Sequence, residues 1–370
     1  ATLRSPFRYD FVGSFLRPQA IKTARAEFKA GEITREQLTA VENEQITLLI
    51  EKQKRAGYHA ITDGEFRRSY WHLDFMWGFT GIDEIELDHG YYFQGEETTH
   101  GSIRVSGKIS GENHPFVEHY KFVKQFEDEN CIARQTMPAP AQLLAELYRE
   151  DNGEKTKKIY PDDEQLIQDI AAAYRTVIRA LYATGCRNLQ LDDCTWGAIV
   201  GDAAKQRYQS LGVDIEEVKS RLLKVNNLAL ENRPEDMVIT SHICRGNYHS
   251  TFFTSGPYDS VADYVFAQEH VDALLLEYDD ERSGGFAPLA KVSPDKKVVL
   301  GLITTKKPEL EDKDKVIARI HEAAKYIPLD RLCLSPQCGF ASCEIGNKLT
   351  EDQQWAKLAL VKEIAEEVWK

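Results

Sequence analysis

The sequence contains no long hydrophobic run. Across its 370 residues, no stretch approaches the roughly 18 consecutive apolar residues that a membrane-spanning helix needs. The first six residues, Ala1 to Pro6, also lack the apolar segment of a secretory signal peptide. We therefore expect no membrane partner and a location in the cytoplasm.

Positive charge is scarce. Lysine and arginine number 46 against 59 aspartates and glutamates, which gives a formal net charge of −13. An acidic surface disfavours nonspecific binding to nucleic acids and to anionic membranes. We expect no nucleic-acid partner, although a locally basic pocket for an anionic substrate is compatible with this balance.

The cysteines do not fit a disulfide scaffold. Their number, seven, is odd, and the chain is far longer than the small secreted domains that disulfides stabilise. In a reducing compartment a cysteine packs in the core, ligates a metal or acts as a nucleophile. The local context must separate these roles for residues 131, 186, 194, 244, 333, 338 and 343.

What the sequence does contain is a repeating alternation of short β-rich runs and helical patterns. Helical patterns cover 35–55, 162–184, 214–232, 260–270, 308–325 and 350–369. The eight β-rich runs are 7–14, 58–62, 131–136, 188–192, 237–242, 273–276, 297–302 and 331–334. This alternation is typical of a parallel sheet with helices outside it. Eight such units predict an α/β fold, a single (β/α)8 TIM barrel over residues 1–370.

An open, doubly wound sheet is the alternative architecture. A dinucleotide-binding version of it requires a Gly-x-Gly-x-x-Gly fingerprint after the first strand. The first predicted strand ends in Val12-Gly13-Ser14-Phe15, which lacks that fingerprint. The barrel is therefore the favoured prediction.

Residues 66–130 interrupt the alternation after the second predicted strand. We interpret them as an insertion in the barrel that forms a lid, with a hairpin strand over 101–109. Their aromatic side chains could cover the pocket, stack on a cofactor or form a subunit contact. Exposed aromatic clusters often mark interfaces, so we favour a subunit contact, as in a homodimer, over the cofactor role. These aromatic residues are Tyr70, Trp71, Trp77, Tyr91 and Tyr92.

Three predicted strands end in side chains that bind metals. In a barrel of this type the chemistry lies at the carboxyl ends of the strands. His242 and Cys244 follow the fifth strand, Glu277 follows the sixth and Cys338 follows the eighth. Residues at i and i+2 of an extended chain project to the same side, so His242 and Cys244 can point together. Two thiolates, an imidazole and a carboxylate are a donor set suited to Zn²⁺.

Other interpretations of these residues stay open. Cysteine is among the most buried residue types, and a His-x-Cys pair alone is a weak signal. Cys194 and Cys343 also lie near strand ends and are alternative ligands. A zinc site with four protein ligands is usually structural, whereas one that exchanges a ligand for substrate is catalytic.

The remaining rim residues fit an amino acid that carries a thiol. Gly13 and Ser14 offer a backbone N–H and a hydroxyl for a carboxylate. Glu65 and Asp192 could accept hydrogen bonds from an ammonium group. The alternatives are an ordinary turn for the Gly-Ser pair and helix caps for the acids.

Six segments, in this order, resemble the C-terminal catalytic barrel of cobalamin-independent methionine synthase, and more closely the shorter stand-alone relatives. They are Val12-Gly13-Ser14-Phe15, Asp63-Gly64-Glu65, Leu189-Gln190-Leu191-Asp192-Asp193, His242-Ile243-Cys244, Leu276-Glu277 and Pro336-Gln337-Cys338-Gly339. The resemblance implies zinc ligation by His242, Cys244, Glu277 and Cys338. It also implies homocysteine binding by Gly13, Ser14, Glu65 and Asp192, and methyl transfer to the zinc-bound thiolate to give methionine.

The sequence departs from that family where the methyl donor, 5-methyltetrahydrofolate, would bind. The family's folate-stacking tryptophan has no counterpart in 137–144, and Ala198 stands where the family has a pterin-binding glutamate. The family's proton-donating histidine is also missing, and Lys306 is the substitute we consider. Arg104 matches a folate-contacting arginine in position, within different surroundings. Another donor, such as methylcobalamin or a small sulfonium compound, therefore stays open.

Two other functions compete with homocysteine methylation. One is zinc-dependent alkyl transfer to or from another thiol such as coenzyme M, whose sulfonate could be held by Arg67, Arg68 or Arg245. The other is a non-catalytic barrel in which zinc is structural and a ligand is bound or sensed.

Overall fold

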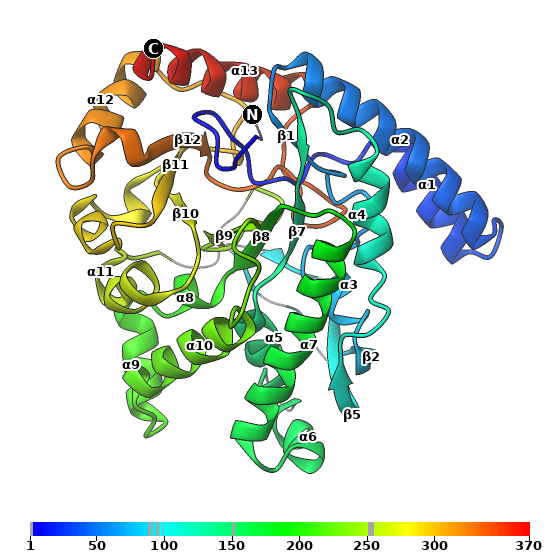
Figure 1. The fold of residues 1–370 in the computed structure, drawn as a ribbon. Coiled ribbons are helices and arrows are strands. Elements are labelled where there is room, and N and C mark those ends of the chain that lie inside the picture. The colour runs from blue at the N-terminus through cyan, green and yellow to red at the C-terminus, as the bar shows by residue number, and fades with distance from the viewer. Residues whose placement is uncertain are drawn as a thin grey trace.

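A six-stranded parallel sheet forms most of the barrel. The computed structural model describes residues 3–87, 90, 92–93, 96–98, 100–149, 152–250 and 255–370. The sheet has the order β12-β11-β10-β9-β8-β7 (Figure 1). Its strands are β7 (Gln135–Pro138), β8 (Asn188–Asp193), β9 (Val238–Ile243), β10 (Ala273–Glu277), β11 (Lys297–Ile303) and β12 (Leu332–Pro336).

The ring closes through shorter and less regular pairings. Strand β1 (Ala60–Ile61) pairs in parallel with β6 (Ile132–Ala133), and β6 leads into β7 after Arg134. The first segment of the chain pairs with β12 at Tyr9, and Asp10 N donates to Leu334 O at 2.9 Å. With the structural neighbour described below, this arrangement confirms the predicted (β/α)8 barrel.

The predicted strand over 7–14 is wrong in its extent. The segment makes an isolated bridge at Tyr9 instead of a regular ladder. The Asp10 carboxylate accepts hydrogen bonds from the amides of Phe7 and Phe11 at 3.1 and 2.8 Å, which holds the backbone in a local turn. Farther along, Gly13 has φ +132°, a conformation that side chains rarely adopt.

The outer helices largely follow the predicted ranges. The pattern over 162–184 is α7 (Asp163–Ala183), and the pattern over 35–55 is α2 (Arg35–Arg55), capped by Thr34. The pattern over 260–270 is instead the short α11 (Asp259–Val261) followed by a π-helix, Ala262–Phe266. The other outer helices are α1 (Gln19–Lys29), α5 (Pro140–Leu147), α6 (Asn152–Ile159), α8 (Thr195–Ala198), α9 (Asp202–Ser210), α10 (Ile215–Ala229), α12 (Lys313–Ala323) and α13 (Glu351–Val368). Short 3-10 helices cover Glu281–Ser283, Ala287–Lys291 and Leu329–Arg331.

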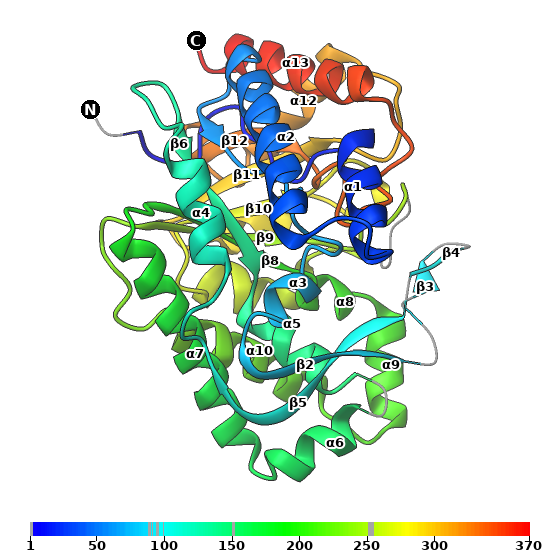
Figure 2. The same cartoon turned by 90° about the vertical axis from the view of Figure 1, so that its right-hand side faces the viewer.

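Residues 66–130 pack along one side of the barrel. They include α3 (Leu73–Met76), β2 (Thr80–Glu86), β5 (Gly101–Ser110) and α4 (Phe116–Lys124). Strands β2 and β5 form a two-stranded antiparallel ribbon, and β5 lies against α6 and α7 (Figure 2). The short strands β3 (Tyr92–Phe93) and β4 (Glu96–Glu97) pair beyond it. Tyr91 and the side chain of Tyr92 lie outside the described part of the chain.

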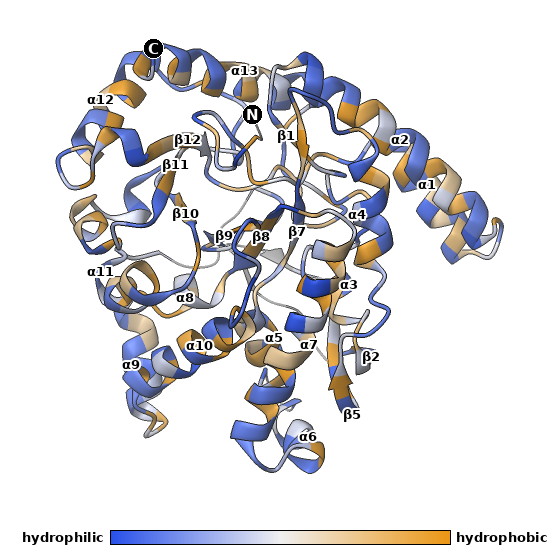
Figure 3. Ribbon diagram, viewed as in Figure 1, coloured by the Kyte–Doolittle hydropathy of each residue, from blue (hydrophilic) through white to orange (hydrophobic). Residues whose placement is uncertain are grey.

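Two apolar layers hold the fold together. The larger layer lies between the strands and the helices, whose outward faces are hydrophilic (Figure 3). A small second cluster, made of Val12, Leu275, Val299 and Cys333, fills the barrel interior. Leu275 is paired in register with His242, and Val299 with Leu275, so this cluster lies in the same layer of the barrel interior as His242. Within the described ranges, none of the helices has both the length and the apolar character needed to cross a membrane.

Candidate metal and thiol site

Strand register places the predicted metal donors on one inner face. Asp192 on β8 pairs with His242 on β9, and His242 pairs with Leu275 on β10. Because side chains alternate along a strand, Cys244 and Glu277, each two residues farther on, point to the same side as His242 and Leu275. The parallel strands end at one edge, so these donors meet at one rim of the barrel.

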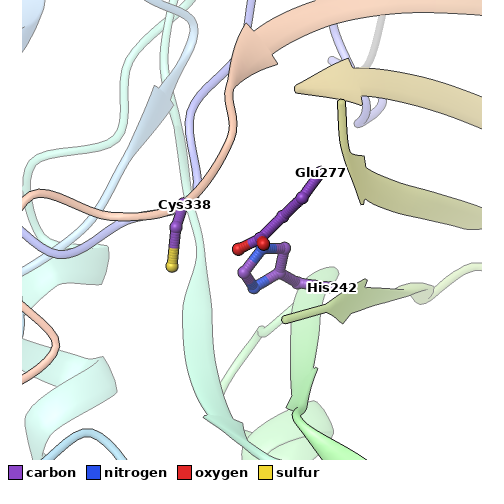
Figure 4. Close-up of side chains that lie close together, drawn as sticks. All are labelled: His242, Glu277 and Cys338. Carbon is purple, nitrogen blue, oxygen red and sulfur yellow. The ribbon is translucent and has the colours of Figure 1, made fainter. Parts of the chain in front are cut away.

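The four predicted metal donors lie close together. Ligand atoms of His242, Glu277 and Cys338 are all within 4.8 Å of one another (Figure 4). The Sγ atoms of Cys244 and Cys338 are 3.9 Å apart. All four side chains are buried, and Glu277 is 0% exposed. The strands thus bring together residues that are far apart in the sequence.

The state of the Glu277 carboxylate fits a bound cation. Its Oε2 atom lies 3.3 Å from the amide of Arg245 and 3.4 Å from Arg282 Nη2. Its Oε1 atom is buried and has no hydrogen-bond partner among the described residues. Buried charges are normally paired or coordinate a metal. An oxygen without a partner beside an imidazole and two thiols therefore fits zinc, whose usual ligands are these atom types.

Neighbouring groups orient these donors. Gly246 N donates to Cys244 Sγ at 3.3 Å, while a hydrogen bond with Cys194 and burial raise the pKa of this thiol. His242 Nε2 lies 3.1 Å from Gln337 O, and its Nδ1 lies 3.4 Å from Asp192 Oδ1. If one ring nitrogen of His242 binds a metal, the other still has a hydrogen-bond acceptor beside it. Such a second hydrogen bond fixes the ring orientation of ligating histidines.

Electrostatics within the group favour a positive charge. Burial lowers the pKa of His242, but the nearby negative charges of Cys338, Asp192 and Glu277 raise it to about 9. The pKa of Cys338 is raised well above its ordinary value by its hydrogen bond with Cys244 and by burial. Without a cation, protons on these groups offset the negative charge of the cluster. A divalent cation would offset the same charge and displace the protons.

A cavity of about 590 Å³ opens above the donors. His242, Cys244 and Cys338 line it, together with Ser14, Glu65 and Asp192. Glu277 is not among the lining residues. The cavity thus presents two carboxylates and the sulfurs of Cys194, Cys244, Cys338 and Cys343 to any ligand that enters.

Glu65 is held tightly beside this cavity. Its backbone has φ +63°, and its amide donates to Asp63 Oδ1 at 2.8 Å. Its Oε2 accepts a hydrogen bond from Thr136 Oγ1 at 3.0 Å, while Oε1 lies 3.5 Å from Arg68 Nη1. Burial raises the pKa of Glu65 to about 7, with a further contribution from the charge of Asp192. Two carboxylates this close favour a ligand with a positive group between them.

Gly13 and Ser14 lie where the first segment meets the last strand. The Gly13 carbonyl accepts a hydrogen bond from Thr62 Oγ1 at 2.7 Å. Ser14 Oγ accepts one from Ala341 N at 3.2 Å. A Cβ atom added to Gly339 would lie 1.8 Å from Ser14 Oγ, so this close approach requires glycine. Ser14 lines the cavity, whereas Gly13 supports it from behind.

Two other predicted residues lie elsewhere. Arg104, on β5, donates to Asn152 Oδ1 at 3.2 Å and is not among the residues that line the cavity. Lys306, after β11, is also absent from the lining, and its buried Nζ has no hydrogen-bond partner among the described residues. The geometry therefore gives neither residue a contact with the cavity.

Sequence reasoning missed the outer part of the cavity. It is lined by helix side chains and includes three arginines, Arg149, Arg207 and Arg221, with Tyr148 and Tyr208. These residues follow the strands by many positions, so the rule that places chemistry at strand ends does not identify them. The sequence signal that could have identified them is the presence of basic and aromatic residues within 148–221.

Comparisons with known proteins agree with this geometry. A family model described as "Cobalamin-independent synthase, Catalytic domain" matches residues 9–366. The chain is 46% identical over 369 residues to the uncharacterized protein YxjH of Bacillus subtilis, covering 99% of this chain and 96% of YxjH. It is 23% identical over 333 residues to a methionine synthase of Saccharolobus solfataricus, covering 89% and 86% of the two chains. A Listeria monocytogenes crystal structure, named as a candidate vitamin-B12-independent methionine synthase, matches with a TM-score of 0.79, 37% identity and 100% coverage of both chains.

Proposed function

The chain belongs to the cobalamin-independent synthase family, and we propose that it is a zinc-dependent methyltransferase that methylates the thiol of homocysteine to give methionine. One observation carries the proposal: the ligand atoms of His242, Glu277 and Cys338 lie within 4.8 Å of one another beside a second thiol. The cavity above them, with its two carboxylates, has the chemistry to hold an amino acid by its ammonium group.

In this proposal His242, Cys244, Glu277 and Cys338 hold the metal. When bound, zinc lowers the pKa of a coordinated thiol and so presents a nucleophilic sulfur at neutral pH. The buried side chains of Leu275, Val299 and Cys333, in the same layer of the barrel as His242, keep water away from that side of the donors. Cys244 and Cys338 supply the negative charge that keeps a metal-bound substrate sulfur electron-rich.

The protein side chains would orient the amino acid. Glu65 and Asp192 accept hydrogen bonds from the ammonium group, and Ser14 contacts the carboxylate. Arg68 keeps Glu65 in place through its Nη1, while Nη2 donates to the carbonyl of Thr136. Fixing both ends of a small substrate aligns its sulfur for in-line attack on a methyl group.

The outer part of the cavity leaves room for the methyl donor. Gln142 and Leu144 line it in the segment where the family has a stacking tryptophan, and Ala198 also lines it. We therefore propose 5-methyltetrahydrofolate or another methyl donor, with roles for Arg104 and Lys306 still predictions from sequence. Residues 66–130 contribute Tyr70, Trp71 and His72 to the cavity lining, which supports a lid role for this insertion.

One observation favours a second candidate, alkyl transfer involving an acidic thiol such as coenzyme M. Arg245 lines the cavity, is 1% exposed and has no hydrogen-bond partner for its guanidinium among the described residues. It could bind a sulfonate. Arg67 and Arg68 are not among the lining residues, since they bond Glu42, Asn43 and Thr136.

The proposal is tested with zinc-loaded protein. We expect one zinc ion per chain, binding of homocysteine by calorimetry, and methionine formed from 5-methyltetrahydrofolate or methylcobalamin, each assayed separately. Coenzyme M is the matched comparison thiol. Protein that holds zinc but binds neither thiol would overturn the methyltransferase proposal and favour a structural metal.

A further inference from the structure

Three successive carbonyls of the first segment accept hydrogen bonds from buried side chains. The bonds run from Arg134 Nη1 to Phe11 O at 2.8 Å, from Gln190 Nε2 to Val12 O at 2.8 Å and from Thr62 Oγ1 to Gly13 O at 2.7 Å. All three donor residues are buried. These bonds fix the path of the backbone that leads to Ser14.

Gln190 also bonds a residue of the proposed substrate pocket. Its Nε2 donates a second hydrogen bond, to Asp192 Oδ1, at 2.8 Å. The two residues are two positions apart on β8, so both side chains project into the barrel. Gln190 is 0% exposed and is not among the residues that line the cavity. It can therefore influence a ligand only through the groups that it holds.

The amide of Gln190 has one possible orientation in this place. A backbone carbonyl and an ionised carboxylate only accept hydrogen bonds, so both neighbours require the nitrogen end of the amide. Each of the two N–H bonds then has its own acceptor. Gln190 is thus a hydrogen-bonded link between Val12, on the first segment, and Asp192, on β8.

The same link divides the two oxygens of the Asp192 carboxylate. Oδ1 accepts from Gln190 and lies 3.4 Å from His242 Nδ1. Both contacts fall on Oδ1 and Asp192 lines the cavity, so Oδ2 is the oxygen available to a ligand. Rotation of the carboxylate would break the bond with Gln190. Gln190 therefore keeps Oδ2 turned toward the cavity.

We propose that Gln190 is a positioning residue that sets the separation between Ser14 and Asp192, and that this separation makes the site selective for thiols carrying an α-amino acid group. The inference rests on the proposed function, in which Ser14 binds the carboxylate and Asp192 the ammonium group. In an α-amino acid one carbon atom joins these two groups, so their distance is fixed. A pocket held at the matching distance binds both groups without reorganisation.

Three thiols of the same chain length test this role. Homocysteine carries both groups, 4-mercaptobutanoate lacks the ammonium group and 3-mercaptopropylamine lacks the carboxylate. We expect zinc-loaded native protein to bind homocysteine roughly 10- to 150-fold more tightly than either analogue, because each charged group adds a hydrogen bond. Calorimetry measures the three dissociation constants.

Gln190→Met has a side chain of similar length and no hydrogen-bond donor. It should raise the Kd of homocysteine by roughly 10-fold, since one of the two charged groups loses its aligned partner. The Kd values of the two analogues should stay nearly unchanged, because a ligand held at one end can follow the side chain that binds it. A general loss of structure would instead weaken the binding of all three thiols. Gln190→Leu should give the same pattern and serves if the methionine variant does not fold.

Asn188→Leu is the matched control. Asn188 lies two residues before Gln190 on the same strand and faces the same side. It is buried, and its side-chain amide has no hydrogen-bond partner among the described residues. This variant should keep the native preference for homocysteine.

A double-mutant cycle tests whether Gln190 acts through Asp192. Asp192→Asn should itself lower the preference for homocysteine. Adding Gln190→Met should then lower it much less than in the native background, because residues that act through one contact have non-additive effects. Full additivity would contradict the proposal.

The outcomes separate the two proposals. An equal loss of affinity for all three thiols in Gln190→Met, or no loss for any of them, would overturn the positioning role and leave the proposed function intact. Native, zinc-loaded protein that binds none of the three thiols would overturn the proposed function itself.

Discussion

The two sides of the barrel rim hold their polar side chains by different means. On the donor side, defined by His242, Cys244, Glu277 and Cys338, β9 and β10 contribute six and five residues to a continuous ladder. On the loop side, defined by Ser14 and Glu65, β1 has two residues and the first segment pairs only at Tyr9 among the described residues. The comparison indicates that the donors are held on regular strands or within two residues of a strand end, whereas Ser14 and Glu65 are held by hydrogen bonds between loops and side chains.

The loop side gains its order from one buried arginine. Arg17 Nη1 donates to the carbonyls of Phe15, Gly64 and Ala341 at 3.0, 3.4 and 2.9 Å. Its Nη2 donates to Arg68 O at 3.2 Å. Burial lowers the pKa of Arg17 to about 10, although the charge of Glu65 opposes this. A single guanidinium thus holds three loops together by hydrogen bonds, as the ladder of backbone hydrogen bonds holds the strands together.

The largest effect is expected from removing a donor. Cys338→Ser should lower zinc affinity by about 100-fold or more, because a neutral hydroxyl replaces a soft anionic ligand. Zinc content after dialysis against a chelator measures it. Cys333→Ser, which changes a buried thiol of the interior apolar cluster that is not among the predicted ligands, is the control and should retain the metal. Full zinc retention by Cys338→Ser would contradict the assignment of metal binding to the donor side.

The next effect concerns substrate binding on the loop side. Glu65→Gln keeps an acceptor for Thr136 but removes the charge that would face an ammonium group. Losing a hydrogen bond to a charged group costs about 1.5–3 kcal/mol, so KM for homocysteine should rise by roughly 10- to 150-fold. Zinc content should stay constant. An unchanged KM would show that Glu65 does not contact the substrate.

Replacing Arg17 tests whether the loop side and the donor side are independent of each other. Arg17→Met should lower the free energy of unfolding by about 1–3 kcal/mol, because buried carbonyls lose their donor. Zinc affinity should change much less than in Cys338→Ser. Arg175→Met, which removes one bond to Leu228 O on the outer helices, is the control and should have a smaller effect on stability. Equal loss of zinc in Arg17→Met would show that the sides are coupled.

The smallest effect is a change of stability with pH beneath the donor side. Burial raises the pKa of Glu269 to about 8; the charge of Asp193 adds to this, and contacts with Asn226, Ser241 and Lys296 oppose it. The folded protein thus keeps a proton that the unfolded chain loses near pH 4.3. Stability from this group is complete below about pH 4.3 and is lost as the pH rises through about 8, by about 1.4 kcal/mol per unit.

Glu269→Gln should flatten this dependence. Denaturant unfolding at pH 6 and pH 8 measures it, and the native protein should lose more stability across that interval than the variant. Glu363→Gln, a change of an exposed carboxylate on α13, should behave like the native protein. Identical slopes in native and Glu269→Gln protein would place the titration elsewhere.

The elements and residues of the donor side could be predicted from the sequence. Hydrophobic runs of four to six residues predict β8 to β12, and a period-3.6 pattern predicts α7. The residues that follow such strands are then placed at the rim. The helix predicted over 162–184 ends within one residue of α7 at either terminus. The donors could be named because a parallel ladder fixes where its last residues lie.

The irregular side could not be predicted in the same detail. Strand β1 is two residues long and the first segment is held by the Asp10 carboxylate, so neither has a periodic signal. The bonds of Arg17 connect loops that are distant in the sequence, and no local pattern reports them. Gln190 was not predicted as a site residue, because its bonds to Val12 O and Asp192 Oδ1 are properties of the folded chain.

The closure of the ring has a consequence for how the protein is made. The first segment hydrogen-bonds Leu334 on the last strand, through Asp10 N and Arg8 O. Contacts between residues so distant in sequence form late, because the intervening chain must be ordered first. Cys338 follows that strand, so a nascent chain still emerging from the ribosome has three donors without the fourth. A metal held by all four donors, as proposed above, would therefore require a completed and closed chain.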